Sequence, residues 1–260
     1  MIKKLQNITN KISPALAIIA ILCLWQILSF TGVVPKFMLP SPVDVVTAFI
    51  DDFPLLMEHA ETTLAESFLG LIIGTVLGFV IAVIMDCFPI VYKSIYPILI
   101  LTQTVPTVAI APLLVLWMGY GILPKITLIV ITTFFPIAIG LLDGFNAADP
   151  DALNLLKAMG ANRAQCFIHI KFPSSLSHFF SGLRISVSYS VVGAVISEWL
   201  GGFKGLGVYM TRVRKSYSFD KMFAVIFFIS FISLVLMFGV TLLKRASMPW
   251  DRIKEDSKFK

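Results

Sequence analysis

Charge is scarce in this 260-residue chain: 14% of its residues are Asp, Glu, Lys or Arg, whereas 57% are hydrophobic. That balance, with a mean hydropathy of +0.89, excludes an ordinary soluble domain and indicates a membrane protein. Cysteine is also rare. Cys23, Cys87 and Cys166 stand far apart, which argues against a disulfide framework or a thiolate metal site, and the three histidines form no i, i+4 metal pair. We therefore expect no bound metal.

The sequence also lacks the common catalytic motifs. It contains no G-x-x-x-x-G-K-[ST] phosphate-binding loop, no H-E-x-x-H and no G-x-S-x-G. Ser174, Ser175 and His178 lie close together, but no acidic residue is placed to orient the histidine as a base. We expect no catalytic residue and no cofactor bound by this chain, so that any energy source must belong to another polypeptide.

Long apolar runs make up most of what is present. A membrane-spanning helix needs about 20 apolar residues, because it rises ~1.5 Å per residue across a ~30 Å hydrocarbon core. We predict an all-α bundle of six such helices that forms one transmembrane domain over residues 1–260. The predicted spans are at about 14–30, 62–85, 94–118, 126–142, 181–200 and 222–243.

The distribution of basic residues predicts the orientation. Lys3, Lys4 and Lys11 precede the first run, which is too long for a signal peptide and lacks a small-residue cleavage site. With both termini inside, 13 of the 21 Lys and Arg residues lie on the inner side and seven on the outer, with Arg184 inside a span. Residues 31–61 are then an outer loop with a short surface helix, and residues 119–125 a tight outer turn.

The second run carries small residues at intervals of four, at Gly70, Gly74 and Gly78. Small residues at that spacing let two helix backbones approach closely within lipid. We predict that these glycines form a helix contact.

The third run is interrupted by prolines at positions 97, 106 and 112, which remove backbone hydrogen bonds. In a membrane the freed groups must be satisfied by protein or by a water-filled cavity, so this span is expected inside the bundle. Gln103 lies just before the middle break. It either faces a translocation pathway or links two helices.

The fifth run places Ser186, Ser190, Gly193 and Ser197 on one helical face. Such a weakly polar stripe either lines a pathway for a polar solute or packs against a neighbouring helix. Glu198 lies near the end of this span, where its carboxylate is expected to reach the interface at little cost.

The outer segment after this span is basic, with Lys204, Arg212, Arg214, Lys215 and Lys221 opposed only by Asp220. This excess departs from the inside preference of basic residues. It predicts either an electropositive mouth for an anionic solute or an acidic partner, or simple anchoring at the membrane interface.

The long inner loop, residues 143–180, carries its own helix signals. Asp149 is a good N-cap, Gly160 suits a left-handed helix end, and the Asn162–Gln165 pair matches a capping box. Pro173 is expected to end the second helix. The loop is therefore predicted to hold two short helices.

The first of these helices has an apolar face formed by Ala152, Leu155, Leu156 and Met159. A helix this short is marginal by itself in water. Its face therefore needs a partner, which is either a groove on another protein or the chain's own bundle.

This loop resembles the cytoplasmic loop of the membrane permeases of binding-protein-dependent ABC importers. Their motif reads Glu-Ala-Ala, three residues, Gly, nine residues, Ile, one residue, Leu-Pro. The matching positions are Asn154, Leu155, Leu156, Gly160, Ile170, Phe172 and Pro173. The spacing is kept, whereas Asn154 replaces the acid, two leucines replace the alanines and Phe172 replaces the leucine.

The resemblance covers nearly the whole chain. The blocks LPSP at residues 39–42, APLLVLWMGYGILPK at 111–125 and SEWLGGFKGLGVYM at 197–210 are similar to permeases for sulfonates, taurine, nitrate and thiamine-precursor pyrimidines. Residues 211–224, TRVRKSYSFDKMFA, look most similar to permeases for thiamine-precursor aminopyrimidines. That class is the expected substrate, with a sulfonate, taurine or nitrate as the alternative.

The resemblance implies a permease in a bacterial inner membrane, paired with a second copy of itself, two cytoplasmic ATPase subunits that use ATP, and an extracytoplasmic solute-binding protein. The implied ATPase-docking residues are Ala152, Asn154, Leu155, Leu156, Met159, Gly160, Ala161, Ile170 and Pro173. The expected pathway residues are Gln103, Ser186, Ser190 and Ser197. The binding protein is expected at Lys204, Arg212, Arg214 and Lys215.

Two other classes fit the sequence less well. An ion-coupled carrier or a channel would place ionisable groups in the middle of the membrane and needs no docking loop. A membrane-anchored DNA binder with a helix-turn-helix would need a strongly basic second helix, for which Arg163 and Lys171 are too few. We therefore expect no nucleic-acid partner.

Overall fold

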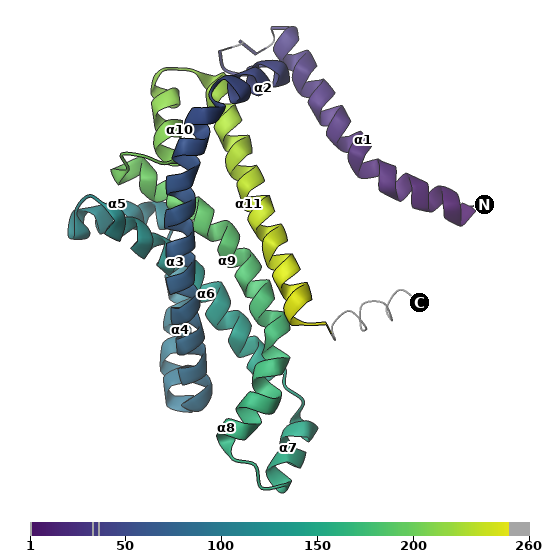
Figure 1. Ribbon diagram of the computed structural model, residues 1–260, viewed down its shortest axis with the longest axis vertical. Helices are drawn as coiled ribbons and strands as arrows, with labels where there is room; N and C mark the ends of the chain where they lie inside the picture. Colours follow the sequence, from purple (N-terminus) through teal and green to yellow (C-terminus); the bar gives the residue numbers. More distant parts are fainter. Residues whose placement is uncertain (1, 33, 36, 250–260) are drawn as a thin grey trace. The chain divides into compact units, whose positions relative to one another are not determined.

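A computed structural model describes residues 2–32, 34–35 and 37–249, with side chains from residue 16 onward (Figure 1). The side chains of Lys3, Lys4 and Lys11, and the basic tail after residue 249, lie outside this described part. The regular elements in the described residues are helices: α1 (Ile2–Phe30), α2 (Pro42–Asp51), α3 (Phe53–Cys87), α4 (Pro89–Thr104), α5 (Thr107–Met118), α6 (Ile122–Asn146), α7 (Pro150–Ala158), α8 (Arg163–Cys166), the π-helix η1 (Phe167–Lys171), α9 (Phe172–Gly201), α10 (Leu206–Lys215) and α11 (Phe219–Ser247).

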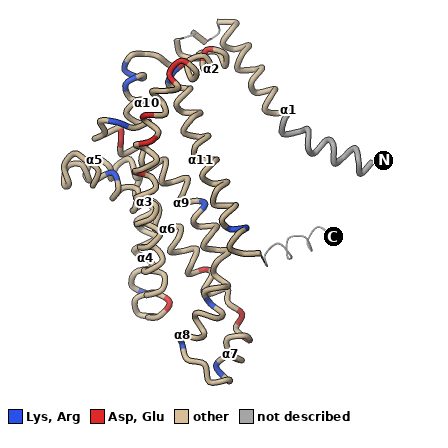
Figure 2. The backbone as a smooth tube through the Cα atoms, viewed as in Figure 1, with Lys and Arg blue, Asp and Glu red and all other residues tan. Residues whose placement is uncertain are grey.

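The predicted spans coincide with the long apolar helices. Four are long and apolar enough to cross a membrane: α3, α6, the continuous stretch Arg163–Gly201, and α11. The third predicted span is the pair α4 and α5, which bends by 99° at its break. The first coincides with the shorter apolar stretch Leu16–Phe30. Figure 2 shows the charged residues of α11 at its two ends, with an uncharged middle.

Three predicted boundaries are wrong. Residues 53–61 belong to α3 rather than to the outer loop, and residues 122–125 belong to α6 rather than to the turn before it. Pro173 does not end a helix, because α9 begins at Phe172 and runs on to Gly201. The proline lies in the first turn of α9, directly after the π-helix, where Phe172 N–H bonds to the carbonyl of Phe167. That wider turn takes up the register change that a proline imposes.

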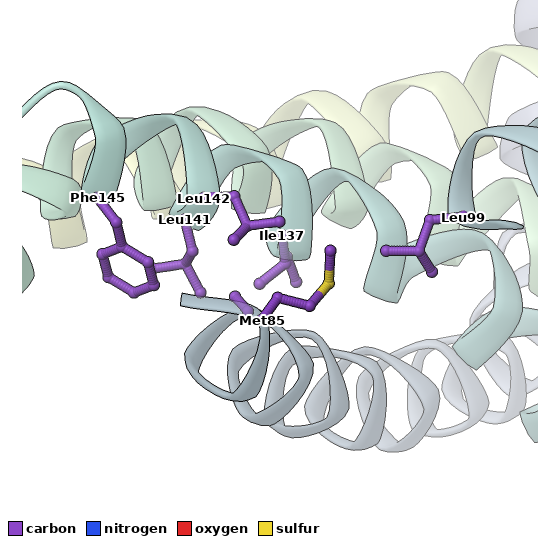
Figure 3. Packing of buried hydrophobic residues seen from close by; sticks show 7 residues of the cluster. Met85, Leu99, Ile137, Leu141, Leu142 and Phe145 are labelled. Carbon is purple, nitrogen blue, oxygen red and sulfur yellow. The ribbon is translucent and has the colours of Figure 1, made fainter. Parts of the chain in front are cut away.

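The described chain divides into two compact units. Unit 1 comprises Met1–Glu58 and Tyr209–Phe228, and unit 2 comprises His59–Val208 and Ile229–Lys260. In unit 2, α6 and α9 pack along much of their length. A buried cluster lies where α3, α4 and α6 meet, and Figure 3 shows its side chains. Its members are Ala82, Met85, Leu99, Ile137, Leu141, Leu142 and Phe145.

Unit 1 is held by a small aromatic core and by two well-formed caps. Trp25 contacts the ring of Phe223 and donates its indole N–H to the carbonyl of Pro40 at 2.9 Å. Ser41 and Asp44 form a capping box that starts α2. The short surface helix predicted within residues 31–61 is therefore present.

A carboxylate links the elements of unit 1. Asp52, at the end of α2, accepts hydrogen bonds from the Tyr209 hydroxyl at 2.5 Å and from the Lys221 ammonium, whose ion pair with Asp52 measures 2.8 Å. Burial raises the pKa of Asp52, but the hydrogen bonds from Lys221 and Tyr209 outweigh it, so the pKa lies below its usual value. The carboxylate is thus ionised at neutral pH and ties α2 to the start of α11.

Candidate functional site

The α7–α8 pair is shaped by the local signals that the sequence contains. Asp149 accepts the Asp151 N–H at 2.9 Å, and Gly160 takes the left-handed conformation with φ of 87°. The Asn162–Gln165 box closes with bonds of 2.8 and 2.9 Å. These three caps are confirmed. Ala161 N–H reaches the Leu156 carbonyl at 3.1 Å, which completes the end of α7.

The apolar face of α7 is open. No residue of this nine-residue helix is buried, and Leu155 and Met159 are 64% and 75% exposed. Ala152, Leu156 and Ala161 are half-buried, and Asn154 is exposed. Figure 1 shows the pair beyond the ends of α6 and α9. The structure therefore places this face where another protein could cover it.

The pair is mounted on the bundle through the π-helix. Lys171 forms an ion pair with Asp86 of α3 at 2.6 Å, and Phe167 packs on Phe145 of α6 with ring centroids 5.2 Å apart. Phe172 contacts Phe79 of α3 edge-on. Ile170, between these contacts, is half-buried. A force on α7 would therefore reach α3, α6 and α9 through packed side chains.

A second feature lies at the broken span. The α4–α5 break opens on a cavity of about 320 Å³ in unit 2, which Gln103 lines together with residues of α6 and α9. Of the predicted pathway residues, Gln103 is the one that reaches this cavity.

The serine stripe faces a helix instead. Ser186, Ser190 and Ser197 are at most 4% exposed. The Ser186 hydroxyl donates to the Thr133 carbonyl of α6 at 2.7 Å, and the other two donate to carbonyls of their own helix. Each of the three serine hydroxyls thus donates to a backbone carbonyl inside the bundle, and their role in a pathway stays a prediction.

The glycine stripe of α3 also faces α6. A Cβ at Gly70 would meet Ile129, one at Gly74 would meet Thr133, and one at Gly78 would lie 2.7 Å from the Phe134 carbonyl oxygen. The two helices approach closely because these positions carry no side chain.

The basic outer residues are divided between the units. Lys204 lies in unit 2, in the loop after α9, whereas Arg212, Arg214 and Lys215 lie in unit 1, in the last turn of α10. Arg214 and Lys215 are exposed. The three α10 residues are well placed to complement the negative end of their helix.

A buried polar cluster escaped the sequence analysis. Glu198 is 1% exposed, so the expectation that it reaches the interface is wrong. Its carboxylate accepts the Thr63 hydroxyl at 2.7 Å and the Gly207 N–H at 2.6 Å. Thr63 in turn accepts the Leu206 N–H at 2.8 Å, and His59 accepts the Gly205 N–H at 3.0 Å. These bonds hold the loop after α9 against α3.

The sequence analysis also missed a neighbouring buried ion pair. Lys125 of α6 and Glu66 of α3 lie 2.6 Å apart, with side chains 8% and 7% exposed. A carboxylate within a predicted apolar span is the signal that could have identified this pair, because such a residue needs a partner.

Comparison with protein families gives a match over most of the chain. The model described as "Binding-protein-dependent transport system inner membrane component" matches residues 74–248. The formylaminopyrimidine transport permease protein ThiX of Halalkalibacterium halodurans is 34% identical over 93% of this chain and 96% of its own. The putative aliphatic sulfonates transport permease protein SsuC of Bacillus subtilis is 27% identical over 88% and 84%.

Solved structures give the same fold. The MetNI methionine ABC transporter, in inward-facing conformations, matches with a TM-score of 0.66 at 18% identity, over 75% of this chain and 96% of its own. An amino acid ABC transporter with histidines matches with a TM-score of 0.61 at 17% identity, over 77% and 95%.

Proposed function

Because the chain belongs to the family of inner-membrane components of binding-protein-dependent transport systems, it is a permease subunit of an ABC importer, and we propose that its cargo is a thiamine-precursor aminopyrimidine. The ThiX relative supports this choice, since its identity of 34% exceeds the 27% of the SsuC and TauC relatives that serve sulfonates and taurine. A sulfonate or taurine is the second candidate cargo.

The exposed face of α7 is the proposed docking surface for the ATPase subunit that drives the import. Leu155 and Met159 would enter a groove of an ATPase subunit, where burying each side chain contributes about 1.5–3 kcal/mol. ATP-driven closure of the motor would then push α7, and the contacts at η1 would pass the push to the bundle. Rigid-body rocking of two copies of the chain would alternate access to a central pathway.

The ends of the bundle have separate partners in this proposal. The solute-binding protein docks on the outer side, where the sequence predicts its contacts at Lys204, Arg212, Arg214 and Lys215, and delivers the solute. The ATPase subunits dock at the α7–α8 pair on the inner side. Ile170, within the π-helix, and Pro173, just after it, are half-buried and remain predicted docking residues together with those of α7.

The test is uptake by the assembled importer. The chain, its ATPase subunit and its binding protein are reconstituted in vesicles with ATP on the ATPase side. We expect ATP-dependent uptake of formylaminopyrimidine and none of taurine. Replacing Leu155 by Gln keeps the helix propensity but removes the apolar contact, so we expect uptake and co-purification of the ATPase to fall at least tenfold.

Lys157→Gln is the matched control. It introduces the same side chain on the opposite face of α7, where Lys157 is exposed, and should leave both readouts close to the wild type. Uptake of taurine but not formylaminopyrimidine would refute the cargo, and full ATPase co-purification with Leu155→Gln would refute the docking surface.

A further inference from the structure

The bend between α4 and α5 leaves backbone groups unpaired beside a cavity. The two helices meet at 99°, around Val105 and Pro106. Pro106 caps α5 without a side-chain hydrogen bond, and the Ala109 N–H bonds to the Pro106 carbonyl at 2.9 Å. Within the described residues the Thr107 N–H has no acceptor, and Thr107 lines the cavity. The positive end of the α5 dipole thus lies at the cavity wall.

Three side chains add polar groups to the same wall. Among the described residues, the Gln103 carboxamide, the Thr107 hydroxyl and the Tyr189 hydroxyl make no hydrogen bond, whereas the Thr102 and Thr132 hydroxyls donate to carbonyls of their own helices at 2.6 and 2.9 Å. Gln103 is exposed and Tyr189 is 46% exposed, so these groups face an open space rather than the packed interior. Lipid is an unfavourable neighbour for them, whereas a polar solute in the cavity could bond to them.

The chemistry of the lining restricts that solute. None of the residues that line the cavity is Lys, Arg, Asp or Glu. The N-terminal end of α5 supplies only about half a positive charge. A sulfonate or a nitrate bound here would therefore lack a full cation to balance its charge, and burying such a charge is expensive. The ring of Tyr189 and the apolar side chains of Val192 and Ile131 instead suit a flat, uncharged ring.

We propose that this cavity is a solute site within the permease, and that the Gln103 carboxamide selects a neutral aminopyrimidine. The amide N–H donates to a ring nitrogen and the amide oxygen accepts from the adjacent exocyclic amino group. Gln and Asn pair with the N6 and N7 edge of adenine in this two-bond manner. A volume of about 320 Å³ lies at the lower end of small-molecule sites. The inference rests on the proposed cargo and adds a selecting residue to it.

The test measures binding to the permease–ATPase complex without the binding protein, so that the bound solute belongs to the permease. In nanodiscs titrated calorimetrically, we expect formylaminopyrimidine and 4-aminopyrimidine to bind and taurine not to compete. Gln103→Glu keeps the size of the side chain but loses the N–H donor, and Gln103→Leu loses both groups. Each should weaken binding of both pyrimidines at least tenfold, because a two-bond contact of this kind is worth about that factor or more.

Thr104→Val is the matched control. Thr104 lies next to Gln103 but does not line the cavity, and its hydroxyl donates to the Leu101 carbonyl at 2.8 Å. The affinity of the Thr104→Val variant for both pyrimidines should match that of the wild type. All three variants should co-purify with normal amounts of ATPase. If the Gln103→Glu variant bound both pyrimidines as tightly as the wild type, or if taurine competed with them equally well, the proposed site would be refuted.

The two proposals fail separately. If the wild-type importer takes up formylaminopyrimidine and Gln103→Glu does so with unchanged KM, the cargo stands and the site is wrong. If the complex binds 4-aminopyrimidine through Gln103 but the importer accumulates no aminopyrimidine, the site stands and the cargo is wrong.

Discussion

Glu66 and Lys125 form an ion pair with both side chains less than a tenth exposed, and one oxygen of Glu66, Oε2, has no partner in the part of the chain that the structure describes. Such a pair contributes little net stability, because desolvation of two charges offsets their attraction. Removing one partner is different. It leaves the other charge buried and unpaired, so each residue depends on the other.

We predict that Glu66→Gln lowers the free energy of unfolding by about 3–5 kcal/mol, the usual cost of breaking a buried pair. The double variant Glu66→Leu with Lys125→Met removes both charges and should restore most of that loss. Unfolding of the detergent-solubilised protein, followed by circular dichroism, measures both. If the single variant were as stable as the wild type, or the double variant no better than the single, the coupling would be refuted.

Glu198 shows why such residues escape sequence reasoning. From its position near the end of a span, an exposed carboxylate is the reasonable expectation. Its burial depends on Thr63, 135 positions earlier, and on Gly207, nine positions later. Gly205, with φ of 130°, lets the loop turn back onto that carboxylate. The contacts that bury Glu198 join residues far apart in the sequence, so the spacing of residues near Glu198 could not predict its burial.

Local signals were sufficient elsewhere. The caps at Asp149 and Gly160 and the Asn162–Gln165 box each depend on residues no more than five positions apart, and the sequence predicted all three. The π-helix between α8 and α9 depends instead on contacts with α3 and α6. Treating Pro173 as a stop was wrong because those contacts allow the helix to continue through the proline.

The approach of α3 to α6 makes a prediction at the scale of helices. A methyl group at Gly78 would meet the Phe134 carbonyl oxygen at 2.7 Å and the Ile137 Cβ at 3.2 Å. Since a backbone carbonyl cannot move aside as a side chain can, Gly78→Ala should push the helices apart. Overpacking of this kind costs about 1–3 kcal/mol.

Gly239 of α11 provides the control, because a Cβ there has nothing within 4 Å. Gly239→Ala gains up to about 1 kcal/mol of helix propensity and should be neutral or stabilising. Thermal unfolding of the two variants in the same detergent should therefore shift the midpoint in opposite directions or move Gly78→Ala alone. Equal shifts would show that α3 and α6 do not touch along the glycine stripe.

For the whole molecule, one chain leaves much of its apolar surface uncovered. Only 22% of the apolar window of α11 and 33% of that of α3 are buried within the chain. Lipid is a suitable cover for these helices. It is an unsuitable cover for the cavity at the α4–α5 break, where Gln103 is exposed and Tyr189 is 46% exposed. Protein or water must face that side, and a second copy of the chain can enclose a shared water-filled pathway there.

We therefore predict that two copies associate. When the chain is expressed with two different affinity tags in one cell, purification through the first tag should retrieve the second. About half of the second-tagged chains should be retrieved if the two forms are expressed equally and every importer holds two copies that mix at random. Mixing separately solubilised membranes after lysis is the control and should retrieve little, because the dimer is expected to form during assembly. A preparation in which the second tag is absent after co-expression would show that a single chain, or a chain with a different partner, encloses the pathway.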